Sequence, residues 1–512
     1  MAKKYKMASV RSYDAAYAIG AKYIKNMEPP PRSDAPPNPD LPPELRNPIW
    51  EVSLASLANT LKYIYEFLHH QCYMLCVHDN NVQMCRLEMQ TTAPIFSEIL
   101  DKQIAKIDAN PILAPAQTKH IRDYVEKNRD KLRVMQCIVK TFGEADATEK
   151  NNEYLTILRG LDLPDGVYIL NLTDAVILRK DGKSPFQMTT GRVQYPEYNF
   201  GKHLPILSMS GQRNYLDIPI PNYDDIGAKP FKAKTLWEEK RKNVAVFRGG
   251  PTGCGYTAET NMRIKLGTMS GSPLLDVRIT KPAGAKNIDT KSVRFDPKYG
   301  LGMMNTRMNF NNQFLNMTEQ SNYKYIIHVD GNVNAYRLLT TMATGSLVLR
   351  VMSAYTSWAE HLMRHKVHYI PVRADLSDLL DVVKWCRKND DKCKEIANNG
   401  MLLARKLQSK AFIKSYMRDA LEHGAAAASY AGVATSSHPL RPPAPEMERS
   451  NSVASIIEEI KSAKEVAPIA AERSGEDVIE MPVGKKRCPK GYSSVSVSNR
   501  KMCKKNTTAK KR

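Results

Sequence analysis

The sequence predicts an α/β fold in which helices cover parallel sheets. Between Ser321 and Leu379, short runs of Val, Ile and Leu alternate with segments of helical spacing, the pattern of a parallel sheet covered by helices. A second sheet pattern opens at Gly166 to Leu178. With 512 residues, of which 42% are hydrophobic, the chain is long enough for two or three such units.

The stretch from Ser321 to Leu379 gives the most detailed prediction. We expect strands at Tyr325–Val329, Leu347–Val351 and His368–Val372, with a helix at Val333–Met342. Ligands of such sheets bind outside the carboxyl ends of the strands. An arginine near a helix N-terminus favours an anion there, so a phosphate-bearing ligand is expected. The residues at this edge are Asp330, Gly331, Asn332 and Arg337.

The earlier elements follow from periodicity and turn residues. The proline-rich run from Met27 to Pro48 cannot continue a helix and favours an extended, flexible segment. A short apolar run then predicts a strand at Tyr73–Val77, with a hairpin partner at Met84–Glu88. Helices are expected at three segments of helical spacing, Trp50–Leu68, Ile95–Ile107 and Thr118–Phe142.

The second half of the chain continues the alternation. Leu204–Ser210 extends the second sheet pattern, and Asn243–Gly250 reads as a strand that enters a glycine-rich loop. Helices are expected at Trp237–Lys242, from near Thr257 onward, and in three segments that end at Gly424.

The net charge of +22 is unevenly placed. Residues 485–512 contain eleven Lys and Arg and no Asp or Glu, which is half of the excess. We expect a tail that contacts a polyanion such as nucleic acid, a membrane surface or an anionic glycan, without the body doing so. No run of eighteen apolar residues and no secretory signal occurs, and nine cysteines are irregularly spaced. A soluble cytosolic protein with reduced thiols is therefore expected.

The segment from Phe247 to Arg263 has the composition of a phosphate cradle. Its glycines allow backbone amides to approach phosphate oxygens, and its arginines and threonine supply further donors. It matches neither a Walker A loop nor G-x-G-x-x-G, so a plain strand-to-helix turn remains an alternative. The candidate ligand-binding residues in it are Arg248, Gly249, Thr252, Gly253 and Arg263.

Two further groups of residues are candidates for chemistry. Asp174 follows a buried strand and is either a cap or a general base. The cysteines and histidines of residues 69–85 lack the spacing of a zinc site, and a buried strand with cysteines is the favoured reading. No Asp-x-Asp occurs in the chain, so a bound nucleotide would be neutralised by arginines and amides rather than by a carboxylate-held metal.

Segments of residues 150–410 resemble glycosyltransferase family 90, which includes protein O-glucosyltransferases and capsule-associated xylosyltransferases. The resemblance implies a GT-B architecture, two Rossmann-like halves that face a cleft, and a metal-independent inverting mechanism with a UDP-sugar donor and no cofactor. It makes Asp174 the general base and assigns the diphosphate to Arg248, Arg263 and Arg337. The matching segments are Ile169–Asp174, Leu204–Pro221, Val244–Gly253, Lys324–Val351 and Val367–Leu379.

The resemblance gives the expected domain boundaries. Residues 1–47 form a basic, proline-rich extension, 48–240 the acceptor-side half and 241–410 the donor-side half. Residues 411–424 form a helix that crosses back, 425–484 a low-complexity linker and 485–512 a basic, disordered tail. The chain departs from the family at Thr173, Ala175 and Pro251, so acceptor specificity is not carried over.

The tail also resembles basic, cysteine-containing tails on proteins of large DNA viruses of eukaryotes, which implies the host cytoplasm or the virion as location. Two rival functions remain open at this point. One is a virion or nucleic-acid scaffold with a degenerate transferase body, which would bind polyanions through residues 485–512. The other is a phosphotransferase, which would require magnesium.

Overall fold

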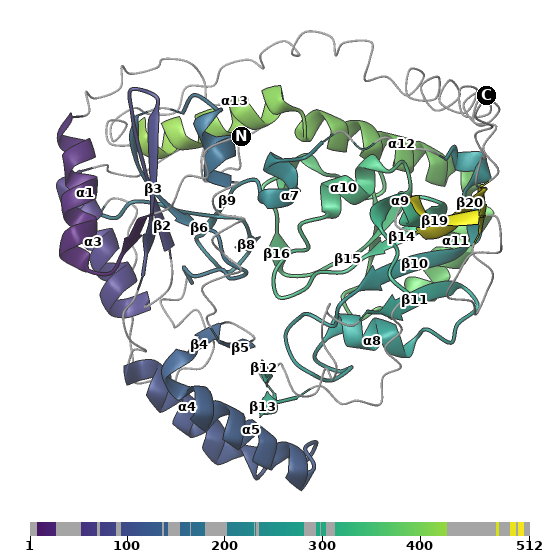
Figure 1. The fold of residues 1–512 in the computed structure, drawn as a ribbon, viewed down its shortest axis with the longest axis horizontal. Coiled ribbons are helices and arrows are strands. Elements are labelled where there is room, and N and C mark those ends of the chain that lie inside the picture. The colour runs from purple at the N-terminus through teal and green to yellow at the C-terminus, as the bar shows by residue number, and fades with distance from the viewer. Residues whose placement is uncertain are drawn as a thin grey trace, which may run out of the picture. The chain divides into compact units, whose positions relative to one another are not determined.

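The computed structural model describes sixteen segments of the chain in two compact units, Met1–Glu446 and Met447–Arg512. Figure 1 shows the fold. The described residues are 8–26, 53–68, 72–88, 94–135, 138–141, 154–163, 165–179, 202–229, 231, 235–280, 293–296, 298–303, 313–426, 478–480, 492–497 and 500–505.

The donor-side half of the first unit is built on a parallel sheet with the strand order β11-β10-β14-β15-β17. In chain order this is 2-1-3-4-5, a doubly wound sheet whose strand order reverses between β10 and β14. The predicted parallel sheet is confirmed. Its strands are β10 (Arg241–Gly249), β11 (Leu275–Ile279), β14 (Tyr323–His328), β15 (Leu347–Val351) and β17 (Ile370–Val372).

Helices cover both faces of this sheet because its strands are apolar on both. Along β15, Leu347 and Leu349 face one core cluster, and Val348 faces another, as the alternation of a strand requires. The first cluster includes residues of α8, α11 and α12, and the second includes α10. These helices are α8 (Met262–Thr268), α10 (Leu338–Ala343), α11 (Leu379–Lys388) and α12 (Asp390–Leu407), with short pieces η3 (Trp237–Glu239), α9 (Met317–Gln320) and η5 (Glu360–Leu362).

The acceptor-side half contains a mixed sheet in the order β1-β3-β2-β6-β7-β9. The predicted hairpin is confirmed: β2 and β3 pair in antiparallel fashion around Asp79 and Asn80, which both have positive φ angles. Strands β6, β7 and β9 are parallel, so only this part of the sheet is Rossmann-like. The strands are β1 (Ala8–Val10), β2 (Cys72–His78), β3 (Asn81–Leu87), β6 (Gly166–Asn171), β7 (Ile206–Ser208) and β9 (Ile218–Pro219).

The beginning of the chain takes part in this half. Strand β1 is parallel to β3, and helix α1 (Tyr13–Asn26) contributes Ala16 and Ala21 to the core that also holds α3. The structure therefore places residues 8–26 in the acceptor-side half, although the sequence predicts that residues 1–47 form a separate basic, proline-rich extension. Further elements are α3 (Leu54–Lys62), η1 (Tyr63–Leu68) and α7 (Tyr223–Ile226), and the pair β8 (Gly211–Gln212) and β16 (Tyr355–Thr356).

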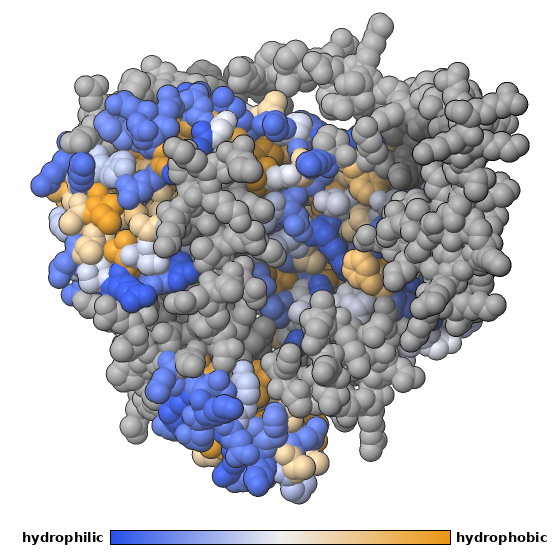
Figure 2. Space-filling view, in the orientation of Figure 1, coloured by the Kyte–Doolittle hydropathy of each residue, from blue (hydrophilic) through white to orange (hydrophobic). Residues whose placement is uncertain are grey.

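A small module combines residues from two distant parts of the chain. Helix α4 (Pro94–Ile107) is as predicted, but the helix expected at Thr118–Phe142 is wrong beyond Asn128. The β-branched residues that follow form a hairpin with Val134 opposite Val139, and Ile138 pairs with Arg294. Figure 2 shows a largely hydrophilic surface over α4 and α5. The other elements are α5 (Pro115–Asn128), η2 (Arg129–Lys131), β4 (Leu132–Met135), β5 (Ile138–Thr141), β12 (Arg294–Asp296) and β13 (Gly300–Gly302).

Two helices begin later than the sequence predicts, and in each case a side chain binds backbone N–H groups at or before the first turn. Asn261 accepts hydrogen bonds from the backbone of Arg263 and Ile264, so α8 begins at Met262 and not near Thr257. Asp330 accepts from the backbone N–H of Ala335 (2.8 Å), which holds residues 331–337 in a turn. Helix α10 consequently begins at Leu338, and Arg337 lies at its N-terminus.

The last helix of the first unit, α13 (Lys410–Ala426), packs against the acceptor-side sheet. Its Tyr416 and Leu421 share a core cluster with Tyr73 of β2 and Leu170 of β6. The Tyr416 hydroxyl also donates to the carbonyl of Pro219 (3.3 Å). Among the helices that the structure describes, none has the length and apolar content needed to cross a membrane.

The second unit contains a three-stranded antiparallel sheet in the order β18-β20-β19. The expectation of a disordered tail is therefore wrong for its strand residues, because the alternating pattern of Tyr492–Val497 is that of a strand. The strands are β18 (Val478–Glu480), β19 (Tyr492–Val497) and β20 (Arg500–Lys505).

Candidate functional site

The candidate site lies at the carboxyl ends of β10 and β14, where the strand order of the donor-side sheet reverses. The loop after β10 and the turn after β14 meet there, because the backbone N–H of Gly253 donates to Oδ1 of Asn332 (3.0 Å). At Gly331 a Cβ atom would lie 2.9 Å from Oγ1 of Thr252. Glycine at 331 is therefore what permits the close approach of the two segments.

Arg263 ties these two segments together. From the first turn of α8, its Nη1 donates to Oγ1 of Thr252 (2.6 Å) and to the carbonyl of Gly250 (3.2 Å). Its Nε and Nη2 donate to the carbonyls of Asp330 (3.0 Å) and Val329 (2.9 Å). Burial and the neighbouring Arg337 lower the pKa of Arg263 to about 9, against the opposing effect of Asp330 and Asp174. Arg263 thus shapes the loop while adding positive charge to it.

Arg337 leaves N–H groups available for a ligand. Its Nη1 donates to the carbonyl of Arg248 (2.9 Å), which is the one hydrogen bond of this guanidinium within the described part of the chain. The guanidinium lies 5.5 Å from the ring centre of Phe247, and that of Arg263 lies 5.9 Å from the same ring. Two guanidinium groups on one buried aromatic ring create a local positive potential that favours an anion.

The structure turns the side chain of Arg248 away from this pair. Adjacent strand residues face opposite sides of a sheet, so Arg248 lies opposite to Phe247. Its guanidinium donates to Oδ1 of Asp276 (2.8 Å) and to three backbone carbonyls, including that of Gln313 (3.0 Å). Of the three predicted arginines, two therefore meet at the glycine-rich loop, and Arg248 contributes its backbone carbonyl.

Asp330 has a supporting role in this geometry. Its Oδ2 accepts from the hydroxyl of Ser353 (2.5 Å) and its Oδ1 from the backbone of Ala335. Burial raises the pKa of this carboxyl above its ordinary value. Gly249 lies at the strand end, where a Cβ atom would come within 3.4 Å of Nη2 of Arg337. Both residues fix the shape of the site, one by its hydrogen bonds and the other by its lack of a side chain.

Asp174 is exposed and follows β6 of the acceptor-side half. Its Oδ1 accepts a hydrogen bond from the hydroxyl of Tyr336 (3.1 Å), which belongs to the donor-side turn. Asn171 fixes the turn that contains Asp174, because Nδ2 of Asn171 donates to the carbonyl of Ala175 (2.7 Å). An exposed carboxylate on a fixed turn can accept a proton from a hydroxyl group that approaches from solvent.

Buried Asp217 fixes the segment that follows Asp174. Its carboxylate accepts from the backbone of Ile177 (2.9 Å) and Leu178 (2.7 Å) and from the hydroxyl of Ser208 (2.8 Å). Burial raises the pKa of Asp217 to about 6. Sequence analysis missed this residue because nothing in the proline-rich segment around it indicates which backbone groups it meets.

Three other residues at the site were missed as well. Arg294 of β12 donates to the carbonyls of Pro251 and Gly253 in the glycine-rich loop, and burial lowers its pKa to about 10. Phe247 supports the two arginines, and Tyr336 reaches Asp174. The aromatic residues adjoin predicted site residues in sequence, which was an available signal. Arg294 lies in a segment without periodicity and gave none.

The cysteines and the metal-ligand candidates lie elsewhere. Cys72, Cys76 and Cys85 are free and buried in the acceptor-side core, as the buried-strand reading expects. In the part of the chain that the structure describes, one group could hold a metal ion, namely His78, Asp79 and Asp165. It lies at the β2–β3 turn and contains no predicted donor-binding residue. Its His78 Nδ1 already pairs with Asp165 (2.9 Å).

The expectation of reduced thiols is only partly right. The five described free cysteines are Cys72, Cys76, Cys85, Cys386 and Cys393. Cys254 is disulfide-bonded. It directly follows Gly253 in the glycine-rich loop.

The first unit is an α/β fold with two main sheets, and at the candidate site two guanidinium groups lie near an exposed carboxylate. Residues 187–437 match the model of Glycosyl transferase family 90. This part of the chain is therefore similar to members of that family.

Relatives fall into a viral and an animal group. An uncharacterized protein (035R) of Invertebrate iridescent virus 3 is 32% identical over 311 residues, which are 56% of this chain and 28% of that protein. Protein O-glucosyltransferase 3 of Rattus norvegicus is 30% identical over 268 residues, 49% of this chain and 45% of the relative. The chain thus spans less than half the length of these relatives.

A solved structure with local similarity is Anabaena HepE in complex with UDP-glucose. The two chains are 14% identical in sequence. The matched region covers 35% of this chain and 49% of HepE, with a TM-score of 0.25.

Proposed function

We propose that the chain is an inverting, metal-independent glycosyltransferase that moves glucose or xylose from a UDP-sugar to a hydroxyl group of a glycan or protein. The observation that supports this best is the contact of Asp174 with Tyr336 (3.1 Å), the residue directly before Arg337. This contact brings a carboxylate, the proposed base, close to the guanidinium groups that we propose bind the diphosphate. The similarity to protein O-glucosyltransferase 3 over 49% of the chain favours glucose.

The diphosphate of the donor would bind at the glycine-rich loop. Arg337 has N–H groups available there, and Arg263 adds its charge without giving up its structural hydrogen bonds. Negative charge on the leaving diphosphate grows as its bond to the sugar breaks. Fixed guanidinium groups stabilise that charge without reorganising, which is how such a site accelerates the reaction.

Asp174 would act on the acceptor. It takes the proton of the acceptor hydroxyl while that oxygen attacks the anomeric carbon from the side opposite the diphosphate. A new carbon–oxygen bond forms, the bond to the diphosphate breaks, and UDP leaves. The proton remains on Asp174, and the configuration at the anomeric carbon is inverted. The hydroxyl of Tyr336 holds the carboxylate in place for this step.

Calorimetric titration of the full chain with UDP, in the presence of either EDTA or Mg²⁺, tests the donor site. We expect the same affinity in both conditions, because arginines take the place of a metal. UDP binding that requires Mg²⁺ would favour a phosphotransferase. Absence of UDP binding in both conditions would refute the donor site.

The basic tail has a function separate from sugar transfer in this proposal. We propose that residues 485–512 contact a polyanion, because strand β20 brings Arg500, Lys501, Lys504 and Lys505 into one strand of a small sheet. Binding to heparin should weaken steeply with salt and should be lost when residues 485–512 are deleted. Binding that survives the deletion would place the polyanion contact on the body. Relatives in iridescent viruses support a viral origin and a location in the host cytoplasm or virion.

A further inference from the structure

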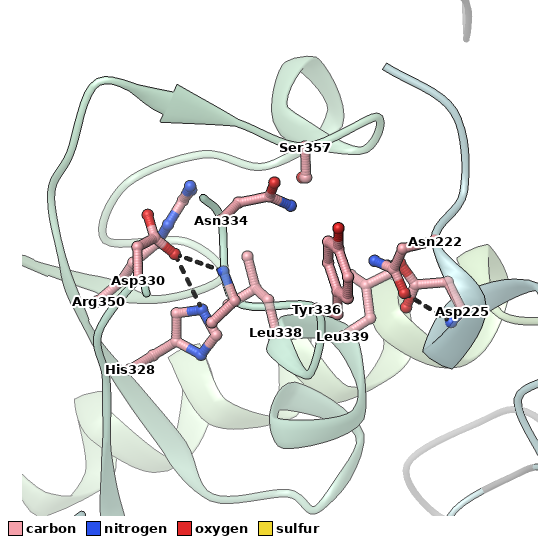
Figure 3. A pocket seen from close by; sticks show the side chains of 11 residues that line it. Asn222, Asp225, His328, Asp330, Asn334, Tyr336, Leu338, Leu339, Arg350 and Ser357 are labelled. Carbon is pink, nitrogen blue, oxygen red and sulfur yellow. Dashed lines mark hydrogen bonds and ion pairs between the residues drawn. The ribbon is translucent and has the colours of Figure 1, made fainter. Parts of the chain in front are cut away.

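A small cavity lies beside the candidate site, under the turn that follows β14. Figure 3 shows it from close by. Its wall includes His328, Asn334 and Tyr336 from the end of β14 and the following turn, Arg350 from β15, and Ser357. It has room for a water molecule or a single hydroxyl group, and not for a sugar ring.

Three polar atoms in the wall lack a hydrogen-bond partner within the described residues. They are Nδ1 of His328, Oδ1 of Asn334 and Oγ of Ser357. His328 is 2% exposed and Asn334 is 6% exposed, so neither side chain is satisfied by bulk water. Buried polar groups are nearly always hydrogen-bonded, and an unpaired one is costly. The cavity is therefore suited to a small polar group that can form a hydrogen bond with its wall.

The chemistry of these atoms defines that group. Burial and the nearby Arg337, Arg350 and Arg263 hold the pKa of His328 well below its usual range, so the imidazole is neutral. Nε2 of His328 faces Oδ1 of Asp330 at 3.8 Å, which favours a proton on Nε2 and leaves Nδ1 as an acceptor.

The same atoms exclude charged occupants. Oδ1 of Asn334 is a second acceptor in the wall, and an unpaired acceptor disfavours an anion. The guanidinium of Arg350 in the wall disfavours a cation. A neutral O–H group fits, because it donates to an acceptor and can accept from the hydroxyl of Ser357.

The position of the cavity indicates which molecule supplies the hydroxyl group that binds in it. Tyr336 lines the cavity and also donates to Asp174. The next residue, Arg337, faces the glycine-rich loop. A donor sugar must lie between the base and the diphosphate. We propose that the cavity binds one hydroxyl group of the transferred sugar and thereby selects the donor. This inference rests on the proposed function.

Calorimetry on the full chain can test this with UDP, UDP-glucose and UDP-xylose as ligands. The variant Asn334→Leu keeps the approximate volume and removes an acceptor, and Ser357→Ala removes only a hydroxyl. Asn398→Leu on α12, which does not line the cavity, is the matched control. We expect the ratio of the Kd for the preferred UDP-sugar to the Kd for UDP to rise about tenfold in both cavity variants. The ratio should not change in the control.

The outcomes separate this inference from the proposed function. Unchanged ratios in both cavity variants would mean that the cavity holds only a water molecule, and the inference would be overturned. If the native chain binds no UDP at all, the proposed function fails and the inference fails with it. If Asn334→Leu does not fold, Ser357→Ala decides alone, because losing one hydroxyl leaves the packing almost unchanged.

Discussion

The hydroxyl of Tyr336 lies 3.1 Å from Oδ1 of Asp174 and joins the two halves of the first unit at the candidate site. Tyr336 and Arg337 are consecutive. One short turn therefore positions both the carboxylate on the acceptor side and a guanidinium on the donor side. Asp330 holds this turn in place, because its carboxylate binds Ala335 and Ser353.

Replacing Tyr336 by Phe should lower kcat while leaving the affinity for UDP unchanged. The ring stays in place, but the carboxylate of Asp174 loses the hydrogen bond that orients it. A hydrogen bond to a charged group contributes about 1.5 to 3 kcal/mol, so we expect a loss of roughly ten- to a hundredfold in kcat. Steady-state kinetics with a UDP-sugar measures this. Tyr299→Phe is the control, because that hydroxyl contacts exposed Glu259. An equal kcat in native and Tyr336→Phe protein would remove Tyr336 from the mechanism.

Replacing Asp174 by Asn should abolish transfer without affecting the fold. General-base catalysis contributes on the order of a hundred- to ten-thousandfold, and the amide cannot take the proton. Asp174 is exposed, so the thermal unfolding midpoint and UDP affinity should stay at native values. Asp123→Asn, also exposed and located on α5, should keep full activity. An active Asp174→Asn variant would show that another group is the base.

Arg337→Ala should mainly weaken the binding of UDP, whereas Arg248→Ala should mainly destabilise the fold. Arg337 has N–H groups available for the diphosphate, so its loss should weaken UDP binding by about 1 to 3 kcal/mol. Arg248 is 4% exposed and paired with Asp276, so its loss should destabilise the fold by about 3 kcal/mol or more. Calorimetry and denaturant unfolding on both variants make the comparison. A specific loss of UDP affinity in folded Arg248→Ala protein would return this residue to the donor site.

Asp217 should make stability depend on pH. Burial raises its pKa from 3.8 to about 6, so the folded protein binds this proton at a higher pH than the unfolded chain does. The resulting stabilisation is complete below pH 3.8 and is lost as the pH rises through about 6. Relative to Asp217→Asn, the native free energy of unfolding should fall over this range by on the order of 3 kcal/mol.

Urea unfolding of native protein and Asp217→Asn at several pH values between about 4 and 7 measures this difference. Parallel pH profiles for the two proteins would show that Asp217 titrates normally. The variant should also lose activity, because Asp217 fixes the backbone of Ile177 and Leu178 next to Asp174.

Much of the donor-side half was predictable because its signals are local. The apolar runs of β14 and β15 and the glycine-rich loop after β10 determine strands and their ends. In a parallel sheet, strand ends lie at one edge. The sequence alone therefore predicts that Thr252, Asn332 and Arg337 lie at a common edge of the sheet. The hairpin of β2 and β3 followed from the same kind of signal.

The helix boundaries were less predictable, because single side chains decide them. Asn261 binds backbone N–H groups that a helix continuing from Thr257 would use internally, and Asp330 binds the N–H of Ala335 and holds the preceding residues in a turn. The tail was misjudged for a related reason: its charge indicated disorder, whereas the alternation in Tyr492–Val497 produced a strand.

The sequence by itself determined the α/β class, the glycine-rich loop, and the candidate roles of Asp174, Arg263 and Arg337. Only the tertiary structure decided which side chains meet. It turned Arg248 toward Asp276, brought Arg294 to the loop, and paired Tyr336 with Asp174, 162 positions apart. The physical reason is that periodicity specifies an element and its buried face through local backbone preferences. The partner of a polar side chain depends instead on how distant elements pack, and the short-range pattern contains no information about that.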